Sequence, residues 1–188
     1  MSAPHPAAAL AESLRQASLA LRAGRSATAE RALRALAAQA PGEPRCLWLL
    51  GVALLDQEKV SASIATLATV LEQAPDFTDA RVDLARACRR GGQAARARAE
   101  VRRVLEQHPH HHLAWQAYGD VLVELEQYTD AREAFERARL TDPQRQRVEA
   151  ATAALVADER KHAEQIFRAI LQSDPSHLAA LCGLAAVS

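Results

Sequence analysis

Residues 115–143 read WQAYGDVLVELEQYTDAREAFERARLTDP, and this stretch decides the fold. From Trp115 to Leu125 the apolar residues recur at three- and four-residue spacing, which is the period of a half-buried helix. A polar dipeptide interrupts the pattern, and a second stripe of the same period follows, made of Tyr128, Ala131, Phe135 and Ala138. Pro143 then ends the stripe, because the residue before a proline disfavours the helical conformation. The stretch therefore predicts a helix, a tight turn and an antiparallel helix.

The same features recur along the chain at a fixed period. Prolines follow one another every 34 residues, with a last one after 32, at Pro41, Pro75, Pro109, Pro143 and Pro175. Two series of small residues keep this spacing, namely Ala29, Ser63, Ala97 and Ala131, and Gly51, Ala85 and Gly119. A series of large apolar residues does so too, namely Leu33, Leu67, Val101 and Phe135, and Phe167 continues it with the same 32-residue step as the last proline. A period of this length indicates an array of repeats. The small residues let paired helices approach closely, so that large neighbours fill the spaces beside them.

Residues 112–145 resemble the tetratricopeptide repeat, W-x2-L-G-x2-Y…A-x3-F…P, through Trp115, Gly119, Ala131, Phe135 and Pro143. The resemblance implies an all-α, right-handed solenoid of about five helix-turn-helix units followed by a final unpaired helix. We expect the units at 10–43, 44–77, 78–111, 112–145 and 146–177, the last helix at 178–188, and a flexible lead at 1–9. The fifth unit is two residues short, so its first helix or its leading turn is trimmed.

The final predicted helix contains no Asp, Glu, Lys or Arg. Its apolar residues would remain partly bare, namely Leu178, Leu181, Leu184 and Val187. Gly51 and Gly119 each lie ten residues after a proline, and the same count from Pro175 gives Ala185. Gly183 falls outside this register, so we expect it to have no packing role. An exposed apolar face marks an interface. Either this helix docks on another molecule, a second copy included, or the chain is cut from a longer protein, and we favour the cut because repeat arrays normally end in a polar cap.

Composition excludes several classes of function. The chain has 188 residues with 23 basic and 23 acidic side chains, and this balance argues against electrostatic binding of nucleic acid or an anionic membrane. It has no apolar run long enough to span a bilayer and no basic, secretory-type start. The cysteines Cys46, Cys88 and Cys182 lie far apart within helical patterns, which is typical of free thiols in a reducing compartment. We therefore predict a cytoplasmic protein without a membrane segment.

Candidate chemistry is sparse. The run from His108 to His112 spans a predicted turn, where neighbouring side chains point in different directions, so we expect a solvated turn rather than a metal site. Phosphate-binding, dinucleotide-binding and metalloprotease motifs are absent. The sequence predicts a non-enzyme that needs no cofactor and no metal.

The resemblance implies where a partner would bind. In tetratricopeptide arrays the first helices of successive units line a concave groove, and six fixed positions of each unit face it. Carried onto this chain, these positions hold Arg45, Trp48, Leu49, Val52, Leu55, Asp56, Asp79, Val82, Asp83, Arg86, Arg89, Arg90, Leu113, Gln116, Ala117, Asp120, Val123 and Glu124. Our predicted binding residues among them are Arg45, Trp48, Leu49, Val52, Arg86, Arg89, Arg90, Gln116 and Asp120. Two alternatives stay open: Trp48 as a displaced core residue, and the arginines as an ordinary solvated face.

Two functions follow from the resemblance. The first is a scaffold that binds a protein or peptide in its groove. The second is the N-terminal array of a larger bacterial enzyme, because residues 114–188 resemble arrays that precede a sulfotransferase domain. Chaperone-tail binding is disfavoured, since the positions of its basic clamp hold other residues, namely Leu14, Ser18, Leu49, Asp79 and Asp83.

Overall fold

The computed structural model describes residues 6–173 and 177–187, which form eleven helices and no strand. Four helical pairs come first: α1 (Pro6–Arg22) with α2 (Ser26–Gln39), α3 (Pro44–Asp56) with α4 (Val60–Gln73), α5 (Thr78–Arg90) with α6 (Ala94–Gln107), and α7 (His112–Glu124) with α8 (Tyr128–Thr141). Three helices follow: α9 (Pro143–Val156), α10 (Arg160–Ser173) and α11 (Leu178–Val187). The all-α prediction is confirmed.

Most first helices begin where a unit was expected to begin, but α1 and α9 do not. Helices α3, α5 and α7 begin at residues 44, 78 and 112, where the units were expected to begin. Helix α1 already begins at Pro6, so the predicted lead at 1–9 is wrong for residues 6–9, while residues 1–5 lie outside the described part of the chain. Pro175 and Ser188 also lie outside it.

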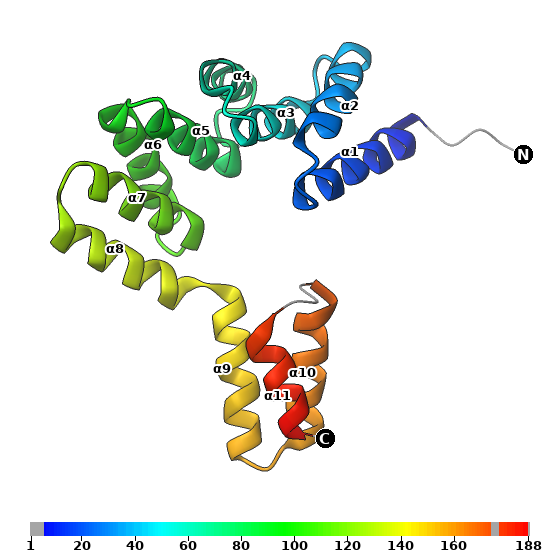
Figure 1. Ribbon diagram of the computed structural model, residues 1–188, viewed down its shortest axis with the longest axis vertical. Coiled ribbons are helices and arrows are strands. Elements are labelled where there is room, and N and C mark those ends of the chain that lie inside the picture. The colour runs from blue at the N-terminus through cyan, green and yellow to red at the C-terminus, as the bar shows by residue number, and fades with distance from the viewer. Residues whose placement is uncertain (1–5, 174–176, 188) are drawn as a thin grey trace, which may run out of the picture.

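Helices α1–α8 form a curved stack (Figure 1). Each first helix packs on the second helix of its own pair and on that of the preceding pair. First helices also contact one another from pair to pair, α1 with α3, α3 with α5 and α5 with α7, whereas α2, α4, α6 and α8 do not contact one another. The stack therefore curves with the first helices on its inner side.

Small residues bring the paired helices together as the sequence predicts. A Cβ atom added to Gly51 would lie 2.6 Å from Cγ of Leu67, and one added to Gly119 would lie 2.5 Å from Cε1 of Phe135. The Ser63 hydroxyl, fully buried, donates a hydrogen bond of 2.8 Å to the Gly51 carbonyl. A larger residue at either glycine would push the two helices apart.

The fifth unit departs from the others at its leading turn. Four residues connect α2 to α3, α4 to α5 and α6 to α7, but Asp142 alone connects α8 to α9. Asp142 is extended (φ −67°, ψ 116°), as expected before a proline, and its carboxylate accepts a hydrogen bond of 2.9 Å from the Gln144 N–H. Pro143 is thus the first residue of α9. The trimmed element is the turn, and the predicted start of this unit at 146 is wrong.

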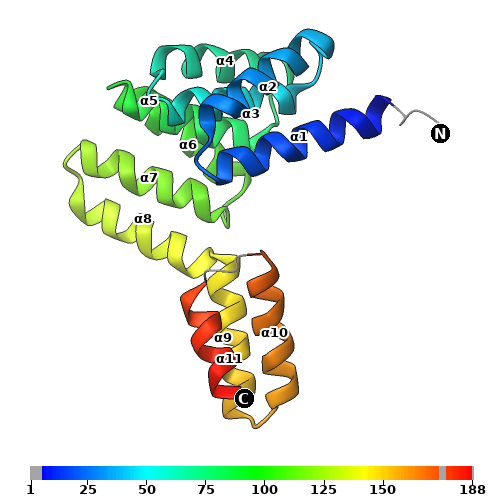
Figure 2. The same ribbon diagram turned by 45° about the vertical axis from the view of Figure 1, so that its right-hand side comes forward.

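The short connection separates α9 from the stack. Within the described residues α9 scarcely contacts α8 and does not contact α7, and it packs instead with α10 and α11 in a three-helix unit (Figures 1 and 2). Phe135 on α8 is consequently 37% exposed. The residues in the same register of the other second helices, Leu33, Leu67, Val101 and Phe167, are at most 1% exposed.

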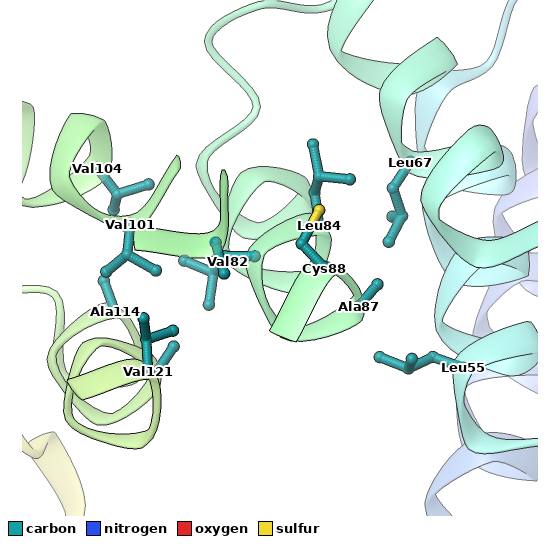
Figure 3. Packing of buried hydrophobic residues seen from close by; sticks show 13 residues of the cluster. Leu55, Leu67, Val82, Leu84, Ala87, Cys88, Val101, Val104, Ala114 and Val121 are labelled. Atoms are coloured by element: carbon teal, nitrogen blue, oxygen red, sulfur yellow. The ribbon is translucent and has the colours of Figure 1, made fainter. Parts of the chain in front are cut away.

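The hydrophobic core divides at the same place. One cluster reaches from α3 to α7 (Figure 3), and it joins the α1–α3 cluster through Trp48 and the α7–α8 cluster through Tyr118. The cluster of α9–α11, centred on Phe167 and Ile170, shares no residue with these three. The described chain therefore consists of a four-pair stack and a separately packed three-helix unit.

Helix α11 closes the three-helix unit. Ala180 is fully buried. Leu184 and Val187 are half-buried against the α9–α10 core, in line with the expectation that they stay partly bare. Gly183 is not incidental, because a Cβ atom there would overlap the ring of Phe167. Leu178 and Leu181 remain exposed, at 74% and 44%.

Candidate binding groove

Two adjoining cavities lie on the inner side of the stack. The first has a volume of about 370 Å³ and is lined by Ser18, Leu21, Arg22, Trp48, Leu49, Val52, Asp79, Val82, Asp83, Arg86 and Leu113, from α1, α3, α5 and α7. The second, of about 490 Å³, is lined by Leu10, Ala11, Leu14, Arg15, Ser18, Leu19, Arg22, Glu43, Arg45, Trp48 and Leu49. They share Ser18, Arg22, Trp48 and Leu49, so together they form one groove with a largely apolar floor.

Trp48 stands at the centre of this groove. Its indole Nε1 donates a hydrogen bond of 2.8 Å to Oδ2 of Asp83, and its ring lies 5.3 Å from the ring of Phe77. The side chain also packs against the hydrophobic clusters on both sides of it. Trp48 therefore belongs both to the margin of the core and to the cavity wall.

Asp83 is the main buried charge of the groove. Its side chain is 15% exposed, and it holds Nη1 of Arg86 at 3.1 Å in addition to the Trp48 indole. Burial raises the pKa of the Asp83 carboxyl above its ordinary value, although the Arg86 charge and the two hydrogen bonds act in the opposite direction. The Asp83–Arg86 pair fixes the polar edge of the first cavity.

The structure brings five of the predicted binding residues into these cavities. Trp48, Leu49, Val52 and Arg86 line the first, and Arg45 lines the second together with Trp48 and Leu49. Gln116 instead lines a separate cavity of about 240 Å³ beside Phe135. Asp120 is half-buried on α7 and lines none of these cavities.

The predicted arginine cluster is held by bonds within the chain. Arg89 Nη1 lies 2.9 Å from Oε1 of Glu124. Arg90 Nη1 donates to the Leu55 carbonyl at 3.1 Å and to Glu58 at 3.2 Å, away from both cavities. The pairs 48 with 83, 89 with 124, and 55 with 90 are each separated by 35 residues. They join successive units. Only the pairs 48 with 83 and 89 with 124 connect two side chains, since Arg90 bonds the Leu55 backbone carbonyl.

Residues of α1 also line the groove and were absent from the predicted set. Ser18 and Arg22 line both cavities, and Leu21 lines the first. All three occupy groove-facing positions of the first unit, so the repeat pattern predicts them in the same way as the groove residues of the next three units.

The histidine run has a structural task at the start of α7. His111 Nδ1 accepts a hydrogen bond of 3.2 Å from the Ala114 N–H and so caps the helix, while Nε2 lies 3.6 Å from Oδ1 of Asp79. Trp115 Nε1 donates to the Pro109 carbonyl at 2.7 Å. In the described part of the chain no three His, Cys, Asp or Glu side chains are grouped so that they could hold a metal ion. Nor does any described helix have the length and apolar character needed to span a membrane.

Comparison with known structures supports the repeat architecture. A thermophilic tetratricopeptide repeat protein of Thermus thermophilus is 17% identical with a TM-score of 0.68, over 95% of this chain and 98% of that one. MamA of Desulfovibrio magneticus is 20% identical with a TM-score of 0.60, over 90% of this chain and 97% of that one. A repeat protein of Parabacteroides merdae is 18% identical with a TM-score of 0.57, over 95% of this chain and 72% of that one. A search of curated proteins finds no match.

Family models give the same answer from the sequence. Models described as tetratricopeptide repeat match residues 14–76 and 50–112, and a further model of that description matches residues 90–155. Together the matches span residues 14–155, which cover the four helical pairs of the stack apart from the first part of α1 (residues 6–13), and nearly all of α9. The chain therefore belongs to the tetratricopeptide repeat family.

Proposed function

We propose that this protein is a non-catalytic cytoplasmic scaffold that holds a protein or peptide segment in the groove formed by α1, α3, α5 and α7. Repeat arrays present extended concave surfaces of this kind, and the family gives the protein the general character of a scaffold for protein interaction. The observation that carries the proposal is the pair of cavities that meet at Trp48 and Leu49. Their apolar lining with a few fixed polar groups is typical of binding sites.

Panning a random peptide library on the full chain tests this proposal. Enriched peptides are measured by fluorescence polarisation against the parent protein and against Val52→Gln, which places a polar side chain in the first cavity. We expect the affinity to fall by about tenfold or more, because an apolar contact of one residue is worth about 1–3 kcal/mol. Val156→Gln is the matched control, since Val156 is 86% exposed and lies outside both cavities.

Trp48→Ala gives a second measurement with a larger expected loss, and circular dichroism shows whether the variant remains folded. Peptides that bind the parent, Val52→Gln and folded Trp48→Ala equally well would overturn the proposal. The alternative, an N-terminal array of a larger enzyme such as a sulfotransferase, stays a prediction that none of the reported matches tests. The gene sequence beyond Ser188 decides it.

Self-association of the protein through α11 is a second candidate function. Leu178 and Leu181 are large apolar residues exposed on a helix that contains no charged side chain. Light scattering at increasing concentration should then show dimers or larger species, which Leu181→Asp should abolish. A monomer at all concentrations contradicts this candidate and leaves the groove proposal untouched.

A further inference from the structure

We propose that the groove selects a peptide in which a large apolar residue lies next to a carboxylate, and that Arg22 and Arg45 bind this carboxylate. This inference rests on the proposed function and adds the chemical class of the partner. We refer to the two side chains and the cavities beside them as the Arg22–Arg45 site.

Three arginines near the groove already hold carboxylates of this chain. Arg86 is held by Asp83 at 3.1 Å, Arg89 by Glu124 at 2.9 Å and Arg15 by Glu12 at 2.6 Å, the last pair on α1 itself. Binding a ligand through any of these arginines would mean exchanging one carboxylate for another. Such an exchange gains little free energy, so these arginines are poor candidates.

Arg22 and Arg45 are in a different situation. Neither makes an ion pair or a side-chain hydrogen bond with any residue that the structure describes, and both side chains are exposed. Arg22 comes from the end of α1 and lines both cavities, while Arg45 comes from the start of α3 and lines the second. Two helices thus bring two available guanidinium groups to one apolar groove.

The acidic residues that line the same cavities form no ion pair with Arg22 or Arg45. Glu43 accepts a hydrogen bond of 3.2 Å from the Arg45 backbone N–H, and Asp83 is bonded to Trp48 and Arg86. Asp79 lies 3.6 Å from the ring of His111. The guanidinium groups of Arg22 and Arg45 therefore have no carboxylate within ion-pairing distance among the described residues.

A carboxylate complements this site in charge. Guanidinium groups bind carboxylates through paired, charge-assisted hydrogen bonds, which are stronger than neutral ones. The cavity that both arginines line also has an apolar lining, to which Leu14, Trp48 and Leu49 contribute. One cavity holds an apolar side chain while the arginines hold the neighbouring acid.

An array of short synthetic peptides tests the inference on the full chain. In each peptide a leucine, phenylalanine or tryptophan stands beside Asp or Glu, and a matched peptide carries Asn or Gln instead. We expect the acidic peptides to bind more tightly than their amide counterparts. The double variant Arg22→Gln/Arg45→Gln should remove this preference, lowering the affinity for acidic peptides by about tenfold for each arginine. The control is Arg31→Gln, because Arg31 is exposed and equally without a partner among the described residues, but it lies on α2 outside both cavities.

The outcomes separate this inference from the proposed function. If acidic and amide peptides bind equally and Val52→Gln abolishes binding, the selection for a carboxylate is overturned. The proposal that peptides bind in the groove then still stands. An acidic preference that survives in the double variant, or that Arg31→Gln removes to the same extent, would also overturn the selection for a carboxylate. If no peptide of the array binds, both proposals fail for peptides of this class. The expected preference, lost only in the double variant, supports both.

Discussion

Phe135 and Phe167 occupy the same register position on α8 and α10, yet their surroundings differ. Phe167 is 1% exposed between α9 and α11, whereas Phe135 is 37% exposed because α9 turns away from α8. The cost of truncating a side chain depends on how much of it is buried and on the cavity left behind. The two residues therefore make a natural test of the separation between α8 and α9.

We expect Phe167→Ala to lower the free energy of unfolding of its own helical unit by about 3–5 kcal/mol, the usual range for a buried phenylalanine. Phe135→Ala should cost less, about 2–3 kcal/mol, because part of its ring already contacts water. Urea unfolding followed by circular dichroism measures both losses. Equal losses would mean that another segment covers Phe135 in solution.

Asp83 makes the stability of the groove depend on pH. Its pKa is raised by burial, so the folded protein binds the carboxyl proton more tightly than the unfolded chain does. Ionisation therefore lowers the free energy of unfolding as the pH rises above the ordinary value of 3.8 and through the raised pKa of the folded state. This contribution is lost in Asp83→Asn, which cannot ionise and still offers an oxygen to Trp48.

We expect the stability of Asp83→Asn relative to the parent to increase as the pH rises from below 3.8 towards neutrality. Arg86 loses its charged partner in the variant, which shifts the difference in free energy of unfolding between variant and parent at every pH. The test is therefore how this difference changes with pH, and not its sign at a single pH. Urea midpoints measured over a pH series give that trend. A difference that stays constant with pH contradicts it.

The helical pairs illustrate what a sequence can predict at the scale of elements. Helices α3, α5 and α7 begin at the first residues of the expected units, because helical period, turn residues and prolines are local features. The start of α9 was not, because a proline that stands in the turn elsewhere becomes the first residue of the helix here. The positions facing the groove were predicted from the repeat. The partners of Arg89 and Arg90 lie in other units, and only packing of the units brings them together.

The turns between the helices of a pair share one backbone conformation. In every pair, and in α9–α10, one turn residue has a positive φ, between 59° and 70°: Gly24, Glu58, Gly92, Glu126 and Asp158. Glycine adopts this conformation without the clash that a Cβ atom causes. The three acidic residues are therefore strained, and the two glycines are not.

We expect Glu126→Gly to raise the free energy of unfolding by roughly 1 kcal/mol, because it removes this strain. Gly92→Ala should lower it by a similar amount. A Cβ atom on Gly92 would meet nothing within 4 Å, so the backbone alone would account for that loss. Urea unfolding checks both variants. A destabilised Glu126→Gly would show that the Glu126 side chain contributes more than its backbone costs.

Across the whole molecule, stability should be distributed according to the contacts between units. Repeat proteins are stabilised by each unit and by its interfaces with its neighbours, so cooperativity ends where an interface is weak. The α8–α9 junction is such a place, since it has a single connecting residue and almost no packing, and the cluster of α9–α11 shares no residue with the others. The stack and the three-helix unit should therefore open independently.

Native-state hydrogen exchange in low urea measures this independence. We expect Phe167→Ala to speed exchange throughout α9–α11 while exchange in α3–α7 stays unchanged, because no shared core transmits the loss. Leu67→Ala, which opens a cavity beneath Gly51 in the continuous core of the stack, should speed exchange in α3–α6 and leave α10 unaffected. If either variant changed exchange equally in both parts, α9 would have to dock on α8 in solution. The Phe135 ring would then be buried, and the molecule would be a single cooperative array.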